Sequence, residues 1–163
     1  MVKKIIITGG LGYIGTELCR IYSGVSWHHK IIVLDNRFVS ERVNQIRNWN
    51  MEFIHGDIMD KELVDKHFKD ADIVHHLAGI TDVPRTKSET SNDRDEKIKL
   101  VGEKGTQNIL DAISSECKII FPSTHVVYEG IDKVKNDIKE EEVTKPVLSY
   151  STSKAINEKQ LKQ

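Results

Sequence analysis

The sequence predicts an α/β fold with a doubly wound parallel sheet of strand order 3-2-1-4-5. Two observations lead to this prediction. Five short apolar runs alternate with segments of helical periodicity over 163 residues, as in consecutive βαβ units with right-handed crossovers. The first apolar run also leads directly into a glycine-rich turn at residues 8–15, and such a turn after the first strand goes with this strand order.

The glycine-rich turn follows the apolar run 5–7 and precedes a helix-like segment at 17–22, with glycines at positions 9, 12 and 15. Glycines at this spacing permit a tight turn, a close approach of the backbone to a pyrophosphate, and close packing of the helix on the strand. The N-terminus of the helix offers unpaired N–H groups and a positive dipole end. Because many glycine-rich turns bind nothing, the spacing alone leaves a plain turn open beside a phosphate site.

A second strand is predicted at Lys30–Asp35, and its terminal acid lies 20 residues beyond Gly15. An acid at this place accepts hydrogen bonds from the adenosine ribose, and its charge repels a 2′-phosphate. Asp35 therefore favours NAD over NADP. The neighbouring Arg37 leaves NADP open, because an arginine there can accommodate the phosphate. A plain turn at Asp35-Asn36 is the other alternative.

Three further strands are predicted at 51–56, 72–77 and 117–121. A helix capped by Asp60 follows the third strand, a long helix runs from Glu96, and the last helix begins at Tyr150. The helix faces are traced by Leu63, Val64, His67 and Phe68, and by Ile98, Val101, Gly105, Ile109 and Ala112. Residues 80–94 and 129–146 are predicted to be loops, the second a mobile surface loop because it is charged and aperiodic.

The carboxyl ends of parallel strands meet at one edge of a sheet, where ligands bind in this class of fold. The residues that map to that edge are 9–15, Asp35, Asp57, Ala78 and Thr124. Their convergence favours a nucleotide site over a plain glycine turn.

Tyr150 and Lys154 are four residues apart and so share one face of the last helix. A tyrosine is a poor base at neutral pH, and a nearby ammonium stabilises its phenolate and lowers its pKa. Thr124, at the end of the preceding strand, can hydrogen-bond the same substrate hydroxyl. The three residues together predict proton transfer coupled to hydride transfer to a nicotinamide.

Composition narrows the partners. Charged residues make up 30% of the chain and nearly balance, with a net charge of -1, which argues against a nucleic-acid partner. The apolar start of the chain is too short for a signal sequence or a bilayer span, so no membrane contact and a cytoplasmic location are expected. Cys19 and Cys117 form no paired motif and are expected to be buried thiols. His75 and His76 should point to opposite faces of a strand, so no metal site is predicted.

Seven segments occur in an order that is typical of one family. They are residues 8–15, 35–36, 56–58, 76–79, 105–110, 123–128 and 150–154. On these segments the chain resembles the extended short-chain dehydrogenase/reductase family, in particular its NAD-dependent nucleotide-sugar epimerase/dehydratase branch. The resemblance implies a Rossmann fold that holds NAD(H) and an oxidoreductase that acts on a nucleotide-sugar.

The resemblance also implies roles for individual residues. Tyr150 would transfer the proton, Lys154 would grip the nicotinamide ribose, and Thr124 stands where the family has a catalytic serine or threonine. Residues 57–58 would flank the adenine, and residues 77–79 would line the middle of the cofactor. The expected cofactor contacts are Gly9, Gly12, Tyr13, Ile14, Gly15, Asp35, Asn36, Asp57, Ile58, Leu77, Ala78, Gly79, Tyr150 and Lys154.

Three positions depart from the family pattern. Gly102 stands where members commonly have an asparagine, which puts one supporting hydrogen bond in doubt. His125-Val126 stand where dehydratases of the branch have an acid pair, which favours a 4-epimerase or ketoreductase over a 4,6-dehydratase. Tyr128, which ends the segment 123–128, is followed by Glu129-Gly130, where family members have a glycine directly after the tyrosine. The sequence indicates no chemistry for this change.

The length differs from the family as well. Members continue well past the helix of Tyr150, so residues 1–163 are expected to be an NAD(P)-binding Rossmann domain from the N-terminal part of a longer protein, without the substrate-binding C-terminal region. A homodimer formed through the helices at 96–114 and from 148 onward is expected, as in relatives. Two alternatives stay open, a non-catalytic NAD(H)-sensing Rossmann protein and an inactive fragment that only binds the cofactor.

Overall fold

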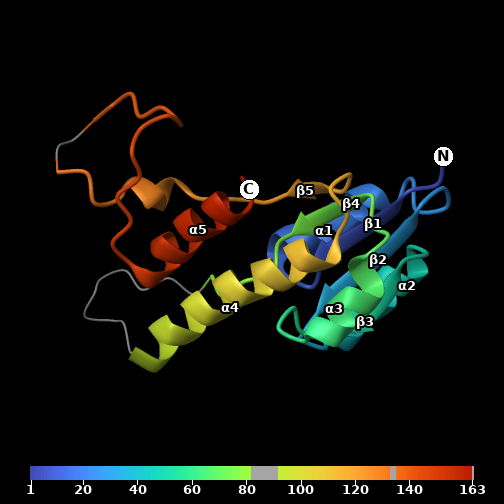
Figure 1. Ribbon diagram of the computed structural model, residues 1–163. Coiled ribbons are helices and arrows are strands. Elements are labelled where there is room, and N and C mark those ends of the chain that lie inside the picture. The colour runs from blue at the N-terminus through green and yellow to red at the C-terminus, as the bar shows by residue number, and fades with distance from the viewer. Residues whose placement is uncertain (82–91, 133–134, 163) are drawn as a thin grey trace. The chain divides into compact units, whose positions relative to one another are not determined.

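Five parallel strands form one sheet in the computed structural model of the chain, which describes residues 1–81, 92–132 and 135–162. The strands are β1 (Lys4–Thr8), β2 (Lys30–Asp35), β3 (Glu52–His55), β4 (Ile73–His76) and β5 (Lys118–Ile120). Their order is β3-β2-β1-β4-β5, with β1 between β2 and β4 (Figure 1). The predicted doubly wound sheet is therefore confirmed, including its strand order.

The helices follow the predicted alternation with the strands. They are α1 (Tyr13–Tyr22), α2 (Ser40–Asn48), α3 (Lys61–Phe68), α4 (Asn92–Ala112), the 3-10 helix η2 (His125–Tyr128) and α5 (Ser149–Gln160). α4 begins at Asn92 and not at Glu96, so the predicted loop at 80–94 was too long; its central residues, 82–91, lie outside the described residues. No helix of the described chain is long and apolar enough to cross a membrane.

Helix α2 was not among the elements that the sequence predicted. Only Val43 and Ile46 of this helix are buried, and its N-cap, Val39, has no side chain that could cap it. The usual sequence indications of a helix, a wide apolar stripe and a polar N-cap, are therefore both weak here.

The two histidines of β4 show that α1 and α4 lie on opposite faces of the sheet. His75 Nε2 lies 2.8 Å from the Tyr22 hydroxyl of α1. His76 Nε2 lies 2.9 Å from the Thr106 hydroxyl of α4. Neighbouring residues of a strand point to opposite faces, so the sheet is covered on both sides, as the doubly wound class requires. The predicted orientation of the two histidines is confirmed.

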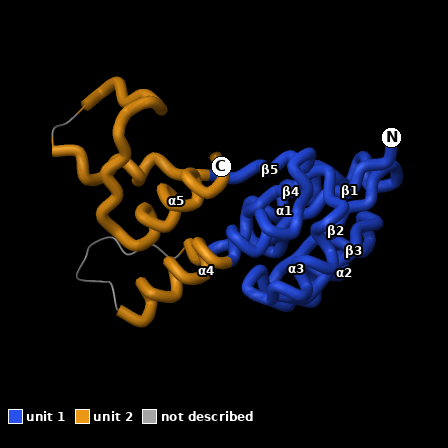
Figure 2. Tube along the Cα trace, in the orientation of Figure 1, with its two compact units in different colours: residues 1–79, 105–122 blue, residues 80–104, 123–163 orange. Residues whose placement is uncertain are grey.

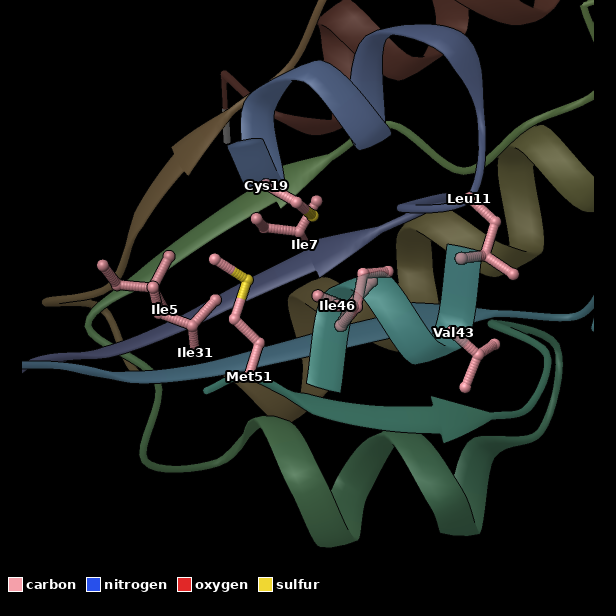
Figure 3. Close-up of a cluster of buried hydrophobic side chains, with 9 residues drawn as sticks. Ile5, Ile7, Leu11, Cys19, Ile31, Val43, Ile46 and Met51 are labelled. Carbon is pink, nitrogen blue, oxygen red and sulfur yellow. The ribbon is translucent and has the colours of Figure 1, made fainter. Parts of the chain in front are cut away.

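A cluster of buried side chains fills the face of the sheet that α1 and α2 cover (Figure 3). Cys19 of α1 and Ile46 of α2 meet alternate residues of β1 and β2 there. The cluster consists of Ile5, Ile7, Leu11, Cys19, Ile31, Val33, Val43, Ile46 and Met51. Cys19 is a fully buried free thiol, as predicted, and Cys117 is a free thiol that is only partly buried.

The chain divides into two compact units (Figure 2). Unit 1 comprises residues 1–79 and 105–122 and contains the sheet, and unit 2 comprises residues 80–104 and 123–163. Unit 2 holds η2 and α5; between them, residues 129–132 and 135–147 form no helix or strand. The predicted loop at 129–146 agrees with this over its described residues.

Candidate functional site

The glycine turn between β1 and α1 is built so closely that side chains would not fit it. Gly9 has a φ of +66°, and a Cβ there would lie 2.8 Å from the backbone nitrogen of Ala78. A Cβ at Gly15 would lie 2.4 Å from the Gly9 carbonyl oxygen. Glycine is therefore required at both positions, at Gly9 for its conformation and at Gly15 for the approach of the helix to the turn.

The N-terminus of α1 is open at this turn. Its N-cap, Gly12, has no side chain to cap it, and the first bond of the helix runs from Thr16 N–H to the Gly12 carbonyl (2.9 Å). The N–H groups of residues 13–15 precede that first bonded turn. Tyr13 and Ile14 are 94% and 60% exposed. This geometry fits an anion such as a pyrophosphate, which would take the N–H groups and the positive dipole end.

Asp35 lies beside the turn with its carboxylate held in place. Its Oδ2 accepts a hydrogen bond from Leu11 N–H, and its Oδ1 accepts one from Arg37 N–H, both 2.9 Å. Arg37 Nε lies 3.4 Å from the same Oδ1. A carboxylate has about four lone-pair sites, so capacity remains for a ribose hydroxyl. Arg37 is thus paired with Asp35, the acid that was predicted to favour NAD.

The other predicted cofactor contacts of unit 1 lie at the ends of β2, β3 and β4. Asn36 Nδ2 donates to Asp57 Oδ2 (2.9 Å), which joins the predicted ribose and adenine residues. Ile58 is buried against Gly105, where a Cβ would lie 2.4 Å from Ile58 Cδ1. The glycine that opens the family-like segment 105–110 therefore makes room for the residue that would flank the adenine.

Thr8 organises the predicted cofactor-lining segment 77–79. Its Oγ1 accepts hydrogen bonds from Leu77 N–H (3.1 Å) and Ala78 N–H (3.0 Å). The Thr8 hydroxyl also lies 3.1 Å from His76 Nδ1. The N–H groups of Leu77 and Ala78 are thus hydrogen-bonded inside the protein. The space beside Gly79 is open, because a Cβ there would meet nothing within 4 Å. Sequence reasoning missed Thr8, although it opens the glycine motif.

Unit 2 brings together Thr124, Tyr150 and Lys154. Lys154 Nζ lies 5.9 Å from the centre of the Tyr150 ring, as expected for residues one turn apart on α5. Tyr150 also hydrogen-bonds the side chain of Thr124, and this bond lowers the pKa of the phenol. The predicted catalytic residues are therefore neighbours, while their roles stay predictions.

The pKa values in this group differ from the sequence-based expectation. Burial raises the pKa of Tyr150, against the Thr124 hydrogen bond that lowers it. Burial also lowers the pKa of Lys154 to about 8. The pKa of Tyr150 in the protein alone is therefore raised where the sequence predicted a decrease, because desolvation of the phenol outweighs the hydrogen bond with Thr124.

Gly102 and Glu129 are two of the positions that depart from the family pattern, and contacts within unit 2 give a structural reason for each. A Cβ at Gly102 of α4 would lie 2.0 Å from Ser153 Oγ, and Asn157 Nδ2 donates to the Gly102 carbonyl (3.0 Å). Ser153 and Asn157 of α5 thus occupy the space that an asparagine at 102 would need. Glu129, to which the sequence assigned no role, accepts hydrogen bonds from the start of α5.

Comparison with known proteins finds one matching family model and several similar enzymes. Residues 6–163 match the family model described as the 3-beta hydroxysteroid dehydrogenase/isomerase family. The chain is 32% identical over 171 residues to a dTDP-D-glucose 4,6-dehydratase of Dictyostelium discoideum, covering 94% of this chain and 38% of that protein. It is 30% identical over 169 residues to a UDP-glucose 4-epimerase of Neisseria meningitidis serogroup C, covering 97% and 47%.

A solved structure agrees with these matches. UDP-glucose 4-epimerase from Brucella ovis, in complex with NAD, superimposes with a TM-score of 0.78 at 26% identity, covering 99% of this chain and 47% of that chain. The chain spans at most about half the length of the curated relatives it matches.

Proposed function

We propose a function on the premise that this chain belongs to the 3-beta hydroxysteroid dehydrogenase/isomerase family and, among extended short-chain dehydrogenases/reductases, to the nucleotide-sugar epimerase/dehydratase branch. The chain is the NAD-binding part of an enzyme that oxidises and reduces the sugar of a nucleotide-sugar. The observation that carries this proposal is the grouping of Thr124, Tyr150 and Lys154 in unit 2, in a chain that also holds a turn fit for a dinucleotide.

Each of the three residues has one task in the proposed reaction. NAD, when bound, supplies an acceptor for a hydride. Thr124 hydrogen-bonds the sugar hydroxyl and orients it toward Tyr150, which takes the hydroxyl proton while the same carbon loses its hydride. The sugar is left as a ketone, and Lys154 holds the nicotinamide ribose. Return of the hydride to the opposite face of the ketone would give the epimer.

We favour a 4-epimerase or ketoreductase over a 4,6-dehydratase. A 4,6-dehydratase must also remove water next to the new ketone, which needs an additional acid and base. The two positions after Thr124 are held by His125 and Val126, and Val126 N–H donates to Thr124 Oγ1 (3.4 Å). Valine can supply no proton, so an acid pair at this place is missing.

Calorimetric titration of the 163-residue chain with NAD and with NADP tests the cofactor assignment. We expect NAD to bind at least about tenfold more tightly, because the Asp35 carboxylate would lie against a 2′-phosphate. ADP-ribose should compete with NAD, since it retains the pyrophosphate and both riboses. Absence of heat with both dinucleotides, from a chain folded by circular dichroism, would overturn the assignment.

The Tyr150→Phe variant tests the catalytic assignment, in whichever form of the protein turns over a nucleotide-sugar. We expect turnover to fall by about 10²-fold or more, because the proton acceptor is lost, while the Kd for NAD stays near that of the parent. Tyr128→Phe, which changes a tyrosine of η2 in the same unit, is the matched control. Unchanged turnover of Tyr150→Phe would exclude the proposed reaction.

A further inference from the structure

Helix α5 begins without a capping side chain of its own. Its N-cap is Leu148, which has no side-chain acceptor. The first hydrogen bond of the helix runs from Thr152 N–H to the Leu148 carbonyl (2.9 Å). The N–H groups ahead of Thr152 therefore need acceptors from outside the helix. Tyr150 lies in this first turn.

Glu129, from a distant part of the sequence, supplies an acceptor for the N–H group of the N-cap residue Leu148. Its Oε1 accepts hydrogen bonds from Leu148 N–H (2.7 Å) and Val147 N–H (2.8 Å), and the Ser151 hydroxyl donates to the same oxygen. In an ordinary capping box, a glutamate inside the helix reaches back to the N-cap N–H. Here a glutamate 19 residues earlier in the chain does so, and its charge also suits the positive end of the helix.

The segment that carries Glu129 is joined to the entry of α5 by its backbone as well. Lys145 N–H donates to the Val127 carbonyl, and Gly130 N–H donates to the Lys145 carbonyl, both at 2.8 Å. Gly130 makes this approach possible, because a Cβ there would lie 2.6 Å from the Lys145 oxygen. The pair Glu129-Gly130, which departs from the family pattern, thus closes the base of the loop before α5.

We propose that Glu129 is a positioning residue that holds Tyr150 against Thr124. Thr124 caps η2, the short helix that ends just before Glu129, and Tyr150 follows Leu148 by two residues. The carboxylate therefore joins the two stretches that carry the proposed proton-transferring pair. This inference rests on the proposed function, since the position of Tyr150 affects chemistry only if Tyr150 transfers the proton.

Three substitutions separate the reach of the Glu129 side chain from its charge. Glu129→Asp keeps the charge but withdraws the carboxylate by about 1.5 Å, one carbon–carbon bond. Glu129→Gln loses the charge but keeps a carbonyl oxygen whose two lone pairs can accept the backbone bonds from Val147 and Leu148. Glu129→Ala removes both. Glu141→Ala, an exposed glutamate of the same loop, is the matched control.

The test uses the 163-residue chain without any nucleotide or substrate, so that its outcome does not depend on turnover. Amide hydrogen exchange reports the bonds of Val147 and Leu148. The titration of Tyr150, followed by NMR of ¹³C-labelled tyrosine and assigned with Tyr150→Phe, reports the contact with Thr124. A role confined to capping the helix would change the first measurement and leave the second unchanged.

For Glu129→Asp and Glu129→Ala we expect about tenfold faster exchange at Val147 and Leu148 and a Tyr150 titration displaced to higher pH, because the Thr124 hydrogen bond is loosened. Glu129→Gln should stay close to the parent in both measurements. Parent-like exchange in Glu129→Asp, or an unmoved Tyr150 titration in a variant whose amides have opened, would overturn the proposal. If Glu129→Ala does not fold, the comparison of Glu129→Asp with Glu129→Gln decides alone.

Discussion

Burial shifts the pKa values of Tyr150 and Lys154 in opposite directions, because it disfavours the phenolate of one and the ammonium of the other. The Thr124 hydrogen bond works against this effect on Tyr150. In the protein alone the proposed base is thus held in its neutral form. We infer that a positive charge near Tyr150, such as that of an oxidised nicotinamide, would complete its activation.

We predict that Thr124→Val raises the pKa of Tyr150 further. The substitution keeps the shape of the side chain but removes the hydroxyl whose hydrogen bond lowers that pKa. The measurement is the NMR titration of ¹³C-labelled tyrosine in each variant. Thr124→Ser, which keeps the hydroxyl, should titrate like the parent, and a lower pKa in Thr124→Val would contradict the assigned contact.

We predict that Lys154→Met increases the free energy of unfolding at pH 7 by about 2 kcal/mol, after allowance for partial exposure of the side chain. Burial lowers the pKa of Lys154 from 10.5 to about 8. Below pH 8 the buried ammonium therefore lowers the free energy of unfolding of the parent. Between pH 8 and 10.5 the unfolded chain binds the proton more tightly, and the parent's stability therefore rises with pH.

Urea denaturation over this pH range measures the effect of Lys154→Met. The stability gap between variant and parent should shrink above pH 8 and close above pH 10.5, the ordinary pKa of lysine. Lys159→Met, an exposed lysine of the same helix, is the control and should show no such gap. A gap that is constant with pH would mean that packing, not charge, separates the two proteins.

At the scale of the elements, a polar cap and a glycine turn explain why the starts of α3 and of the β1–α1 turn could be predicted. Asp60, predicted to cap the third helix, accepts a hydrogen bond from Leu63 N–H (3.1 Å). The glycine turn that begins α1 is confirmed in place, since no side chain fits at Gly9 or Gly15. Helices α2 and α5 lack a capping residue of their own; of these, α2 went unpredicted.

We predict that Asp60→Ala lowers the free energy of unfolding by about 1 kcal/mol, the usual cost of losing an N-cap. The Leu63 N–H group, which donates a hydrogen bond to the Asp60 carboxylate, would lose its protein partner. Equilibrium urea unfolding measures the change. Asp60→Asn retains an acceptor at the same place and should cost only a few tenths of that amount; an equal loss in both variants would show that charge matters more than the cap.

At the scale of the whole molecule, we predict that the chain forms a homodimer. α4 is one of the two helices through which this chain is expected to dimerise, and its Leu100 is 55% exposed. Sedimentation velocity should give about twice the 18.6 kDa mass of the chain. Leu100→Glu should shift the population to monomer, because a charge would be buried at the interface. A monomeric parent at high concentration would contradict the prediction.

The sequence by itself determined the strand order, the glycine turn, and the choice of candidate cofactor-binding and catalytic residues, because each depends on local patterns. Apolar runs with turn residues between them define βαβ units, and the fixed hand of those units then selects the topology. Asp35, Thr124, Tyr150 and Lys154 could be selected for the same reason, since each occurs at a predicted strand end or on one helical face.

Only the tertiary structure decided what depends on contacts between residues far apart in the sequence. Burial, which no local pattern reports, raised the pKa of Tyr150 where the sequence predicted a decrease. Thr8 supports the 77–78 backbone from about 70 residues away, and Glu129 caps α5 across a loop. These hydrogen bonds exist because folding brings separate segments together, so their partners cannot be deduced from spacing along the chain.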